Sequence, residues 1–226
     1  MRTVIFDLDG TLADTSRDLI AAANACFLGL GRGAPLDPVA DAATAFLGGR
    51  AMLRLGFERL GSPAVEDEVL AQFPAFLDHY ARDIDRHSRL YPAAADAVER
   101  LREAGYAVGI CTNKPEALAE TLLARLGVRH LFGSLVGADT LPTRKPDPAP
   151  YRAAVERAGG VVARSILIGD SETDRATARA AGVPCVLVTF GPAAAAMPAL
   201  QPEALMAHYD ELFDLAERLI PPEAAE

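Results

Sequence analysis

Two aspartates separated by one residue, Asp7 and Asp9, follow an apolar run near the beginning of the chain. In a β-strand, residues i and i+2 point to the same side, so residues 4–6 predict a buried strand that ends with both carboxylates on a common side. Two carboxylates held this close repel each other unless a cation lies between them or one of them keeps its proton. The spacing therefore indicates a divalent metal site, acid–base chemistry or both, with a solvated Asp-rich turn as the structural alternative.

Five further polar side chains follow predicted strands or precede a predicted helix from residue 112 onward. Ligands of open α/β sheets collect at the carboxyl ends of the strands, so we expect these side chains to share one sheet edge with Asp7 and Asp9. The five are Thr112 and Asn113 after residues 106–111, Lys145 in a proline-rich turn before residues 148–158, and Asp170 and Asp174 after residues 165–168.

Each of these residues also has a purely structural interpretation. Thr112 can cap the helix that follows it, and Lys145 can be a surface lysine. Asp170 and Asp174 can be acids that the macrodipole favours at a helix N-terminus. Their order along the chain and their placement after predicted strands together favour a shared site.

The chain from residue 106 onward alternates short apolar runs with segments whose apolar residues recur at helical spacing. Such alternation predicts an α/β fold, a three-layer arrangement in which a Rossmann-like parallel sheet lies between helices. Beyond the first strand, the predicted strands cover residues 106–111, 134–138, 165–168 and 184–188, and the predicted helices cover residues 115–127, 148–158, 172–181 and 205–220.

Residues from about 14 to 88 break this alternation, because they show no convincing strand pattern. The helical patterns in this stretch cover residues 16–30, 51–60 and 65–84. The simplest interpretation is a core domain of residues 1–13 and 89–226, with a helical cap domain of residues 14–88 inserted after the first strand. These helices can be extra packing alone, but their place directly after the Asp7–Asp9 strand favours a lid that excludes water from the site.

The composition permits a small anionic substrate and argues against nucleic acid. Half of the 226 residues are hydrophobic and the formal net charge is −9 at pH 7, which opposes binding to a phosphate backbone. The three cysteines are far apart and form no CxxC pair, which suits a reducing compartment. No signal peptide or membrane-spanning run is recognised. We therefore expect a cytoplasmic protein, monomer or homodimer, that binds neither nucleic acid nor membrane.

The run DLDGTL at residues 7–12 resembles the opening motif of the haloacid dehalogenase superfamily in its phosphatase branch. The later polar residues follow in the order of the superfamily's other motifs. The resemblance implies a hydrolase that forms an aspartyl-phosphate intermediate beneath a hinged helical cap. The dehalogenases of this superfamily lack the second aspartate, so the presence of Asp9 disfavours dehalogenation.

The resemblance also implies a role for each residue. Asp7 matches the nucleophile, which suits aspartate because an acyl phosphate hydrolyses readily. Asp9 matches the general acid and base. Thr112 and the backbone N–H of Asn113 match the groups that bind phosphoryl oxygens, and Lys145 matches the cation that offsets charge on Asp7 and the phosphoryl group.

The implied cofactor is Mg²⁺, which prefers oxygen ligands and keeps several of its waters. Its ligands would be Asp170, a carboxylate oxygen of Asp7 and the backbone carbonyl of Asp9. Asp174 matches a supporting acid that orients metal-bound water or Lys145.

Several stretches resemble bacterial phosphoglycolate phosphatases, which release glycolate and phosphate from 2-phosphoglycolate. These stretches are residues 14–15, 91–92, 112–115, 145–150 and 169–171. Substrate recognition is expected in the cap, in the loop of residues 46–50. Gly48 matches the first glycine of a Gly-x-Gly pattern there, but Arg50 replaces the second. A guanidinium suits a substrate carboxylate, and a solvated arginine at a helix start is the alternative.

Other activities share these core residues. Phosphatases of sugar phosphates, pyrophosphatases and phosphomutases of the β-phosphoglucomutase type would show nearly the same motifs, and differ in how the cap holds the substrate. A non-catalytic phosphate-binding or protein-interaction module on the same fold is expected to lose Asp7 or Asp9, and this chain has both.

Overall fold

The computed structural model of the chain describes residues 1–222. The chain forms two compact units by its internal contacts. One unit combines Met1–Ala13 with the chain from Leu90 onward, and the other consists of Asp14–Arg89. The first contains the sheet, and the second contains four α-helices.

The first unit is built on a six-stranded sheet in the order β5-β4-β1-β6-β7-β8, with every neighbouring pair parallel. Its strands are β1 (Thr3–Phe6), β4 (Ala107–Cys111), β5 (Ser134–Val136), β6 (Ser165–Gly169), β7 (Cys185–Val188) and β8 (Ala204–Met206). Strand β1 is central, and its last residue Phe6 lies opposite Ile110 of β4 and Ile168 of β6. This register brings the residues that follow these three strands to one edge of the sheet.

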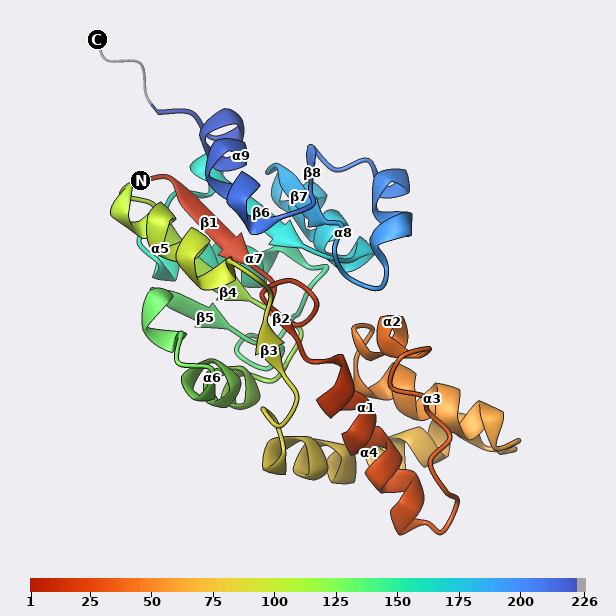
Figure 1. Ribbon diagram of the computed structural model, residues 1–226. Helices are drawn as coiled ribbons and strands as arrows, with labels where there is room; N and C mark the ends of the chain where they lie inside the picture. The colour runs from red at the N-terminus through yellow and green to blue at the C-terminus, as the bar shows by residue number, and fades with distance from the viewer. Residues whose placement is uncertain (223–226) are drawn as a thin grey trace. The chain divides into compact units, whose positions relative to one another are not determined.

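Helices cover both faces of this sheet (Figure 1). The α-helices of the unit are α5 (Ala94–Glu103), α6 (Glu116–Arg125), α7 (Pro148–Arg157), α8 (Glu172–Ala181) and α9 (Leu212–Leu219), and the 3₁₀ helices are η1 (Arg129–Leu131), η2 (Val162–Arg164), η3 (Ala194–Leu200) and η4 (Tyr209–Glu211). Helices α7 and α8 pack against β1, β4, β6 and β7, while α5 packs against β4 and α9. The result is the predicted α/β fold.

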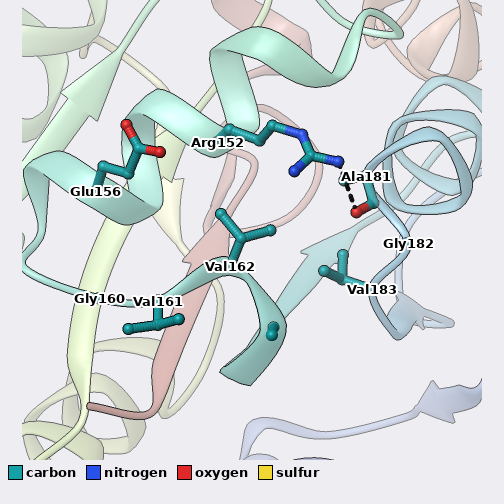
Figure 2. A pocket seen from close by; sticks show the side chains of 9 residues that line it. Arg152, Glu156, Gly160, Val161, Val162, Ala181, Gly182 and Val183 are labelled. Carbon is teal, nitrogen blue, oxygen red and sulfur yellow. Dashed lines mark hydrogen bonds between the residues drawn. The ribbon is translucent and has the colours of Figure 1, made fainter.

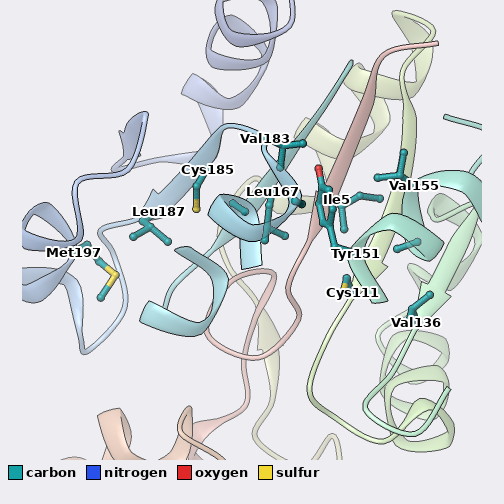
Figure 3. Packing of buried hydrophobic residues seen from close by; sticks show 13 residues of the cluster. Ile5, Cys111, Val136, Tyr151, Val155, Leu167, Val183, Cys185, Leu187 and Met197 are labelled. Atoms are coloured by element: carbon teal, nitrogen blue, oxygen red, sulfur yellow. The ribbon is translucent and has the colours of Figure 1, made fainter. Parts of the chain in front are cut away.

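The core between the sheet and helices α7 and α8 is apolar (Figure 3). Ile5 of β1, Leu167 of β6 and Leu187 of β7 point into it and are fully buried beside Tyr151 and Val155 of α7. Strands of a parallel sheet are buried on both faces, and therefore read as continuous apolar runs. The burial of every residue of β1 and β6 agrees with this rule and fixes the backbone from which the site residues extend.

The second unit is helical and contains α1 (Ser16–Gly29), α2 (Ala42–Ala45), α3 (Gly49–Arg59) and α4 (Val65–Arg82). Helices α1 and α3 meet through the rings of Phe27 and Phe57, whose centroids are 4.9 Å apart. A Cβ at Gly56 would lie 2.2 Å from the Phe27 ring, so this contact requires glycine. Two short paired strands, β2 (Ala13–Asp14) and β3 (Arg89–Leu90), mark where the chain passes between the units.

The predicted helix over residues 205–220 is wrong. The structure has strand β8, the 3₁₀ helix η4 and the shorter helix α9 in this stretch. Apolar spacing alone cannot separate a short edge strand and a turn from the helix that follows them. The turn is fixed by His208, whose side chain accepts a hydrogen bond from the N–H of Asp210. Helices α2 and α5 were not predicted, while the other predicted elements are confirmed to within a few residues at their ends.

Candidate metal and active site

Polar residues follow three neighbouring strands and lie together at the edge of the sheet formed by the carboxyl ends of these strands. Asp7 follows β1, Thr112 follows β4 and Asp170 follows β6. The parallel ladder continues one residue beyond β1, because the N–H of Asp7 donates to the carbonyl of Ile168 at 2.9 Å. Similarly, the N–H of Thr112 donates to the carbonyl of Val136 at 3.0 Å. The backbone at this edge is therefore held by the sheet itself.

Three carboxylates meet at this edge. Asp7, Asp170 and Asp174 each contribute a carboxylate oxygen, and these oxygens all lie within 4.8 Å of one another. Asp174 is fully buried and Asp170 is 7% exposed, while the Asp7 side chain keeps 14% exposure. The structure thus brings together three of the predicted acids, with Asp7 as the most accessible of them.

Lys145 lies between two of these acids. Its Nζ is 2.6 Å from Oδ1 of Asp174 and 3.0 Å from Oδ2 of Asp7, and its side chain is almost fully buried. Burial acts to lower the pKa of Lys145, but the charges of Asp174 and Asp7 outweigh it and raise that pKa above its ordinary value. The two carboxylates therefore favour the ammonium form of Lys145, which is a buried residue of the site rather than a surface lysine.

The crowding of the acids changes their protonation. Burial raises the pKa of Asp7 to about 6 against the opposing charge of Lys145, and Asp174 adds to the rise. Burial also raises the pKa of Asp170 well above its ordinary value, with Asp174 and Asp7 contributing. One lysine is too little positive charge for three buried carboxylates, so a cation at this edge would favour their ionised forms.

Asp174 uses both of its oxygens in hydrogen bonds. Oδ1 contacts Lys145, and Oδ2 accepts from the hydroxyl of Ser171 at 2.6 Å and from the N–H of Asp170 at 3.2 Å. Ser171 is also the N-cap of α8, where its hydroxyl accepts from the N–H of Asp174. Asp174 is thus held on both sides and contacts Lys145, and its supporting role in orienting metal-bound water or Lys145 stays a prediction.

Thr11 and Tyr209 also support the site, and sequence reasoning gave neither of them a role. The hydroxyl of Thr11 donates to Oδ1 of Asp170 at 3.0 Å, and the hydroxyl of Tyr209 donates to the carbonyl of Thr11 at 2.7 Å. Both side chains are buried. Tyr209 comes from η4, almost two hundred residues away, and nothing in the local sequence pattern could have paired it with Thr11.

Asp9 is held by a second lysine. Both carboxylate oxygens of Asp9 accept from Nζ of Lys114, at 2.8 and 2.9 Å. Sequence reasoning gave Lys114 no role. One signal could have found it, because the chain has 22 basic residues and only two of them, Lys114 and Lys145, are lysines. Asp9 as a backbone metal ligand stays a prediction.

Thr112 and Asn113 occupy the turn after β4. The Thr112 hydroxyl accepts a hydrogen bond from the N–H of Lys114 at 3.2 Å. The Asn113 side chain donates to the carbonyl of Lys145 at 3.0 Å. This turn therefore joins the segments that carry the two lysines.

Gly48 and Arg50 belong to the other unit, at the start of α3. Gly48 is the N-cap residue and has a φ of +95°, which favours glycine. The guanidinium of Arg50 lies 4.2 Å from the centroid of the Phe73 ring, which is within cation–π range. Arg50 thus has a structural partner within its own unit, and its contact with substrate stays a prediction.

A separate pocket of about 510 Å³ lies at the amino-terminal ends of β6 and β7, away from the carboxyl ends that carry the acids (Figure 2). It is lined by residues that precede β6 and β7, including Val161, Val162 and Val183. Arg152 crosses it to donate to the carbonyl of Ala181 at 3.0 Å. Its lining brings together neither a group of carboxylates that could bind a metal nor a nucleophile. The edge that carries Asp7, Asp170 and Asp174, called the acidic edge below, is therefore the better candidate for catalysis.

The donor set at the acidic edge suits a hard dication. With Asp7, Asp170 and Asp174 ionised and Lys145 protonated, the cluster has two excess negative charges, and all its ligand atoms are oxygens. Mg²⁺ binds through one or two carboxylates and retains waters. Asp7 and Asp170 are therefore the residues that fit it here, with Asp174 committed to Lys145.

The sequence matches a known family over most of its length. The family of haloacid dehalogenase-like hydrolases matches residues 1–182. The chain belongs to the haloacid dehalogenase-like hydrolases. Among the described residues of this hydrolase, no helix has the length and apolarity needed to cross a membrane.

Relatives of this hydrolase include bacterial phosphatases of similar length. A phosphoglycolate phosphatase of Mesorhizobium japonicum is 39% identical over 221 residues, which cover 96% of each chain. One of Agrobacterium fabrum is 36% identical over 225 residues, which cover 98% of this hydrolase and 95% of the relative. A crystal structure described as a predicted phosphoglycolate phosphatase from Haemophilus somnus has a TM-score of 0.82 at 25% identity, covering 95% of this hydrolase and 97% of that chain.

The close approach of β6 to α8 gives a direct test of the acidic cluster. A Cβ at Gly169 would lie 2.3–2.5 Å from the side chain of the fully buried Asp174. We expect Gly169→Ala to displace this carboxylate, to destabilise the fold by about 1–3 kcal/mol and to reduce the rise in melting temperature that we expect on addition of Mg²⁺. Gly133→Ala is the matched control, because its nearest neighbour would be at 3.6 Å. Equal melting curves for both variants would contradict this geometry.

Proposed function

We propose that this hydrolase cleaves small phosphomonoesters with Mg²⁺, through an aspartyl phosphate on Asp7. The observation that carries the proposal is the position of Asp7, which is the most exposed of three clustered acids and contacts Lys145 at 3.0 Å. A buried ammonium beside a carboxylate nucleophile offsets the negative charge that develops during phosphoryl transfer. The family membership supports the same chemistry.

In the first step, an oxygen of Asp7 bonds to phosphorus while the ester P–O bond breaks. The leaving alkoxide takes a proton from Asp9, which is thereby left as a carboxylate. In the second step, water loses a proton to Asp9 and its oxygen bonds to phosphorus, so the P–O bond to Asp7 breaks and phosphate leaves. Splitting the reaction in this way replaces one difficult displacement with two easier ones.

The remaining core residues bind and neutralise the phosphoryl group. We assign the Thr112 hydroxyl and the Asn113 N–H to phosphoryl oxygens, and Lys145 to charge balance. Asp7 and Asp170, with the Asp9 carbonyl as a further expected ligand, would hold Mg²⁺, which would supply additional positive charge against the same oxygens. Asp174 holds Lys145 in place through the 2.6 Å contact.

We infer that the substrate is 2-phosphoglycolate, and the products glycolate and phosphate. Support comes from relatives named phosphoglycolate phosphatases that are 36–39% identical over nearly their whole length. The excess negative charge of the protein opposes nucleic-acid binding, and it does not oppose a small anionic metabolite bound at a locally positive site. Sugar phosphates, pyrophosphate and a phosphomutase reaction are the alternatives, because they would use the same core residues.

We further propose that the helical unit of Asp14–Arg89 is the substrate-recognising cap of the core. The unit follows directly on the segment that carries Asp7 and Asp9, and an insertion at that point of the chain suits a lid. The expected setting is the cytoplasm, as a monomer or homodimer, with three buried cysteines in the thiol form.

The proposed chemistry predicts a strict need for Asp7 and for the metal. Asp7→Asn is expected to lower kcat for p-nitrophenyl phosphate to less than about one thousandth. Removal of Mg²⁺ with a chelator should abolish the activity, and added Mg²⁺ should restore it. The control is Asp210→Asn, because this aspartate is 78% exposed. Activity that persists in Asp7→Asn would rule out the aspartyl phosphate.

Measurement of phosphate release from different phosphate esters distinguishes 2-phosphoglycolate from the alternative substrates. Across a panel of metabolite phosphates, 2-phosphoglycolate should give the highest kcat/KM. A sugar phosphate or pyrophosphate that ranked first would make the substrate assignment wrong and leave the hydrolytic chemistry intact. Isomer formation without phosphate release would instead indicate a phosphomutase.

Arg50 gives a separate prediction on specificity. If its guanidinium binds the substrate carboxylate, Arg50→Ala should raise KM for 2-phosphoglycolate at least about tenfold, the scale of a lost hydrogen bond to a charged group. KM for p-nitrophenyl phosphate should change far less, because this substrate lacks a carboxylate. Arg54→Ala on the same helix is the control, since its partner is Glu66. Equal effects of Arg50→Ala on both substrates would leave Arg50 with its structural role over Phe73.

A further inference from the structure

Lys114 is a buried lysine that the proposed reaction does not yet use. Its side chain is 3% exposed, and its Nζ contacts both oxygens of Asp9. Burying an ammonium and a carboxylate costs free energy unless each satisfies the other. A bidentate contact of this kind fixes the carboxylate in one orientation, because rotation about its bond to Cβ would break one of the two hydrogen bonds.

The backbone of Lys114 is also fixed, by hydrogen bonds of its N–H and of its carbonyl. Its N–H donates to the Thr112 hydroxyl at 3.2 Å, and its carbonyl accepts from the N–H of Ala138 at 3.0 Å. Pro115 follows and begins α6 as its N-cap residue, which restricts the conformation of the residue before it. Lys114 therefore offers its ammonium from a rigid position at the carboxyl end of β4.

The use of lysine in this chain is selective. Of the 22 basic residues, 20 are arginine, and the two lysines both lie at the acidic edge, one on Asp9 and one on Asp7 and Asp174. An ammonium is a compact point charge, whereas a guanidinium is a larger planar fork. Beside a carboxylate that must also reach a substrate oxygen, the compact group leaves more room.

We propose that Lys114 is a positioning residue for Asp9, a role that rests on the proposed function. Lys114 holds the Asp9 carboxyl in the orientation from which it passes a proton to the leaving oxygen and later takes one from water. The two lysines thus have different roles in the proposed reaction. Lys145 offsets charge at the nucleophile Asp7, and Lys114 orients the general acid and base Asp9.

The leaving group provides the test, because an alkoxide needs a proton from Asp9 and p-nitrophenolate does not. The ratio kcat/KM reports only the steps up to transfer of the phosphoryl group to Asp7. Lys114→Met is expected to lower kcat/KM for 2-phosphoglycolate about a hundredfold, within the range of general acid catalysis. The loss for p-nitrophenyl phosphate should be at least ten times smaller.

A double-mutant cycle with Asp9→Asn decides whether Lys114 acts through Asp9. In the Asp9→Asn background, adding Lys114→Met should change kcat/KM for 2-phosphoglycolate by less than about twofold, because the group it positions is already gone. Multiplicative losses, or equal losses for both substrates in Lys114→Met alone, would overturn the proposal. Wild-type protein that hydrolyses neither substrate would overturn the proposed function instead.

A spectroscopic measurement keeps the proposal testable if Lys114→Met does not fold. Protein labelled with ¹³C at lysine Cε should give two signals, because the chain has two lysines. Asp9→Asn is expected to shift one of them and leave the other in place. Two unmoved signals would contradict the contact between Lys114 and Asp9.

Discussion

The structure of this hydrolase depends on one electrostatic constraint, the placement of three carboxylates around a single buried ammonium. Asp7, Asp170 and Asp174 have oxygens within 4.8 Å of one another, and Lys145 contacts two of them. Burial and mutual repulsion raise the pKa of Asp7 to about 6. Such a cluster needs additional positive charge to keep its acids ionised, and a dication bound at the same edge would supply that charge.

The fold maintains this constraint from several directions. The register of β4, β1 and β6 fixes the backbone, and Gly169 lets Asp174 approach without a steric clash. Thr11 donates a hydrogen bond to Asp170, and Tyr209 in turn donates to the carbonyl of Thr11. The apolar core beneath the sheet, with Ile5 and Leu167 fully buried, removes the freedom that would let the acids move apart. Charge repulsion at the edge is thus opposed by packing below it.

Much of this arrangement could be predicted from local patterns in the sequence. Asp7, Asp170 and Lys145 each follow a strand or precede a helix that apolar periodicity makes visible, and the carboxyl-end rule gathers them at one edge. Tyr209 could not be predicted, because its partner Thr11 is almost two hundred residues away and its own segment reads as part of a longer helix. Lys114 is hard to identify from its local sequence, because it lies in a short turn between β4 and α6. The contrast between two lysines and twenty arginines is a sequence signal that points to Lys114, and the structure places both lysines on aspartates.

The most direct measurement of the central constraint is calorimetric titration of the protein with Mg²⁺ at pH 6 and pH 8, in buffers of different ionisation enthalpy. Metal binding needs ionised ligands and therefore displaces any protons they hold. Because the pKa of Asp7 is raised to about 6, Mg²⁺ should release more protons at pH 6 than at pH 8, and Asp170→Asn should weaken binding sharply. Mg²⁺ binding without proton release at pH 6, or with unchanged affinity in Asp170→Asn, would contradict the account.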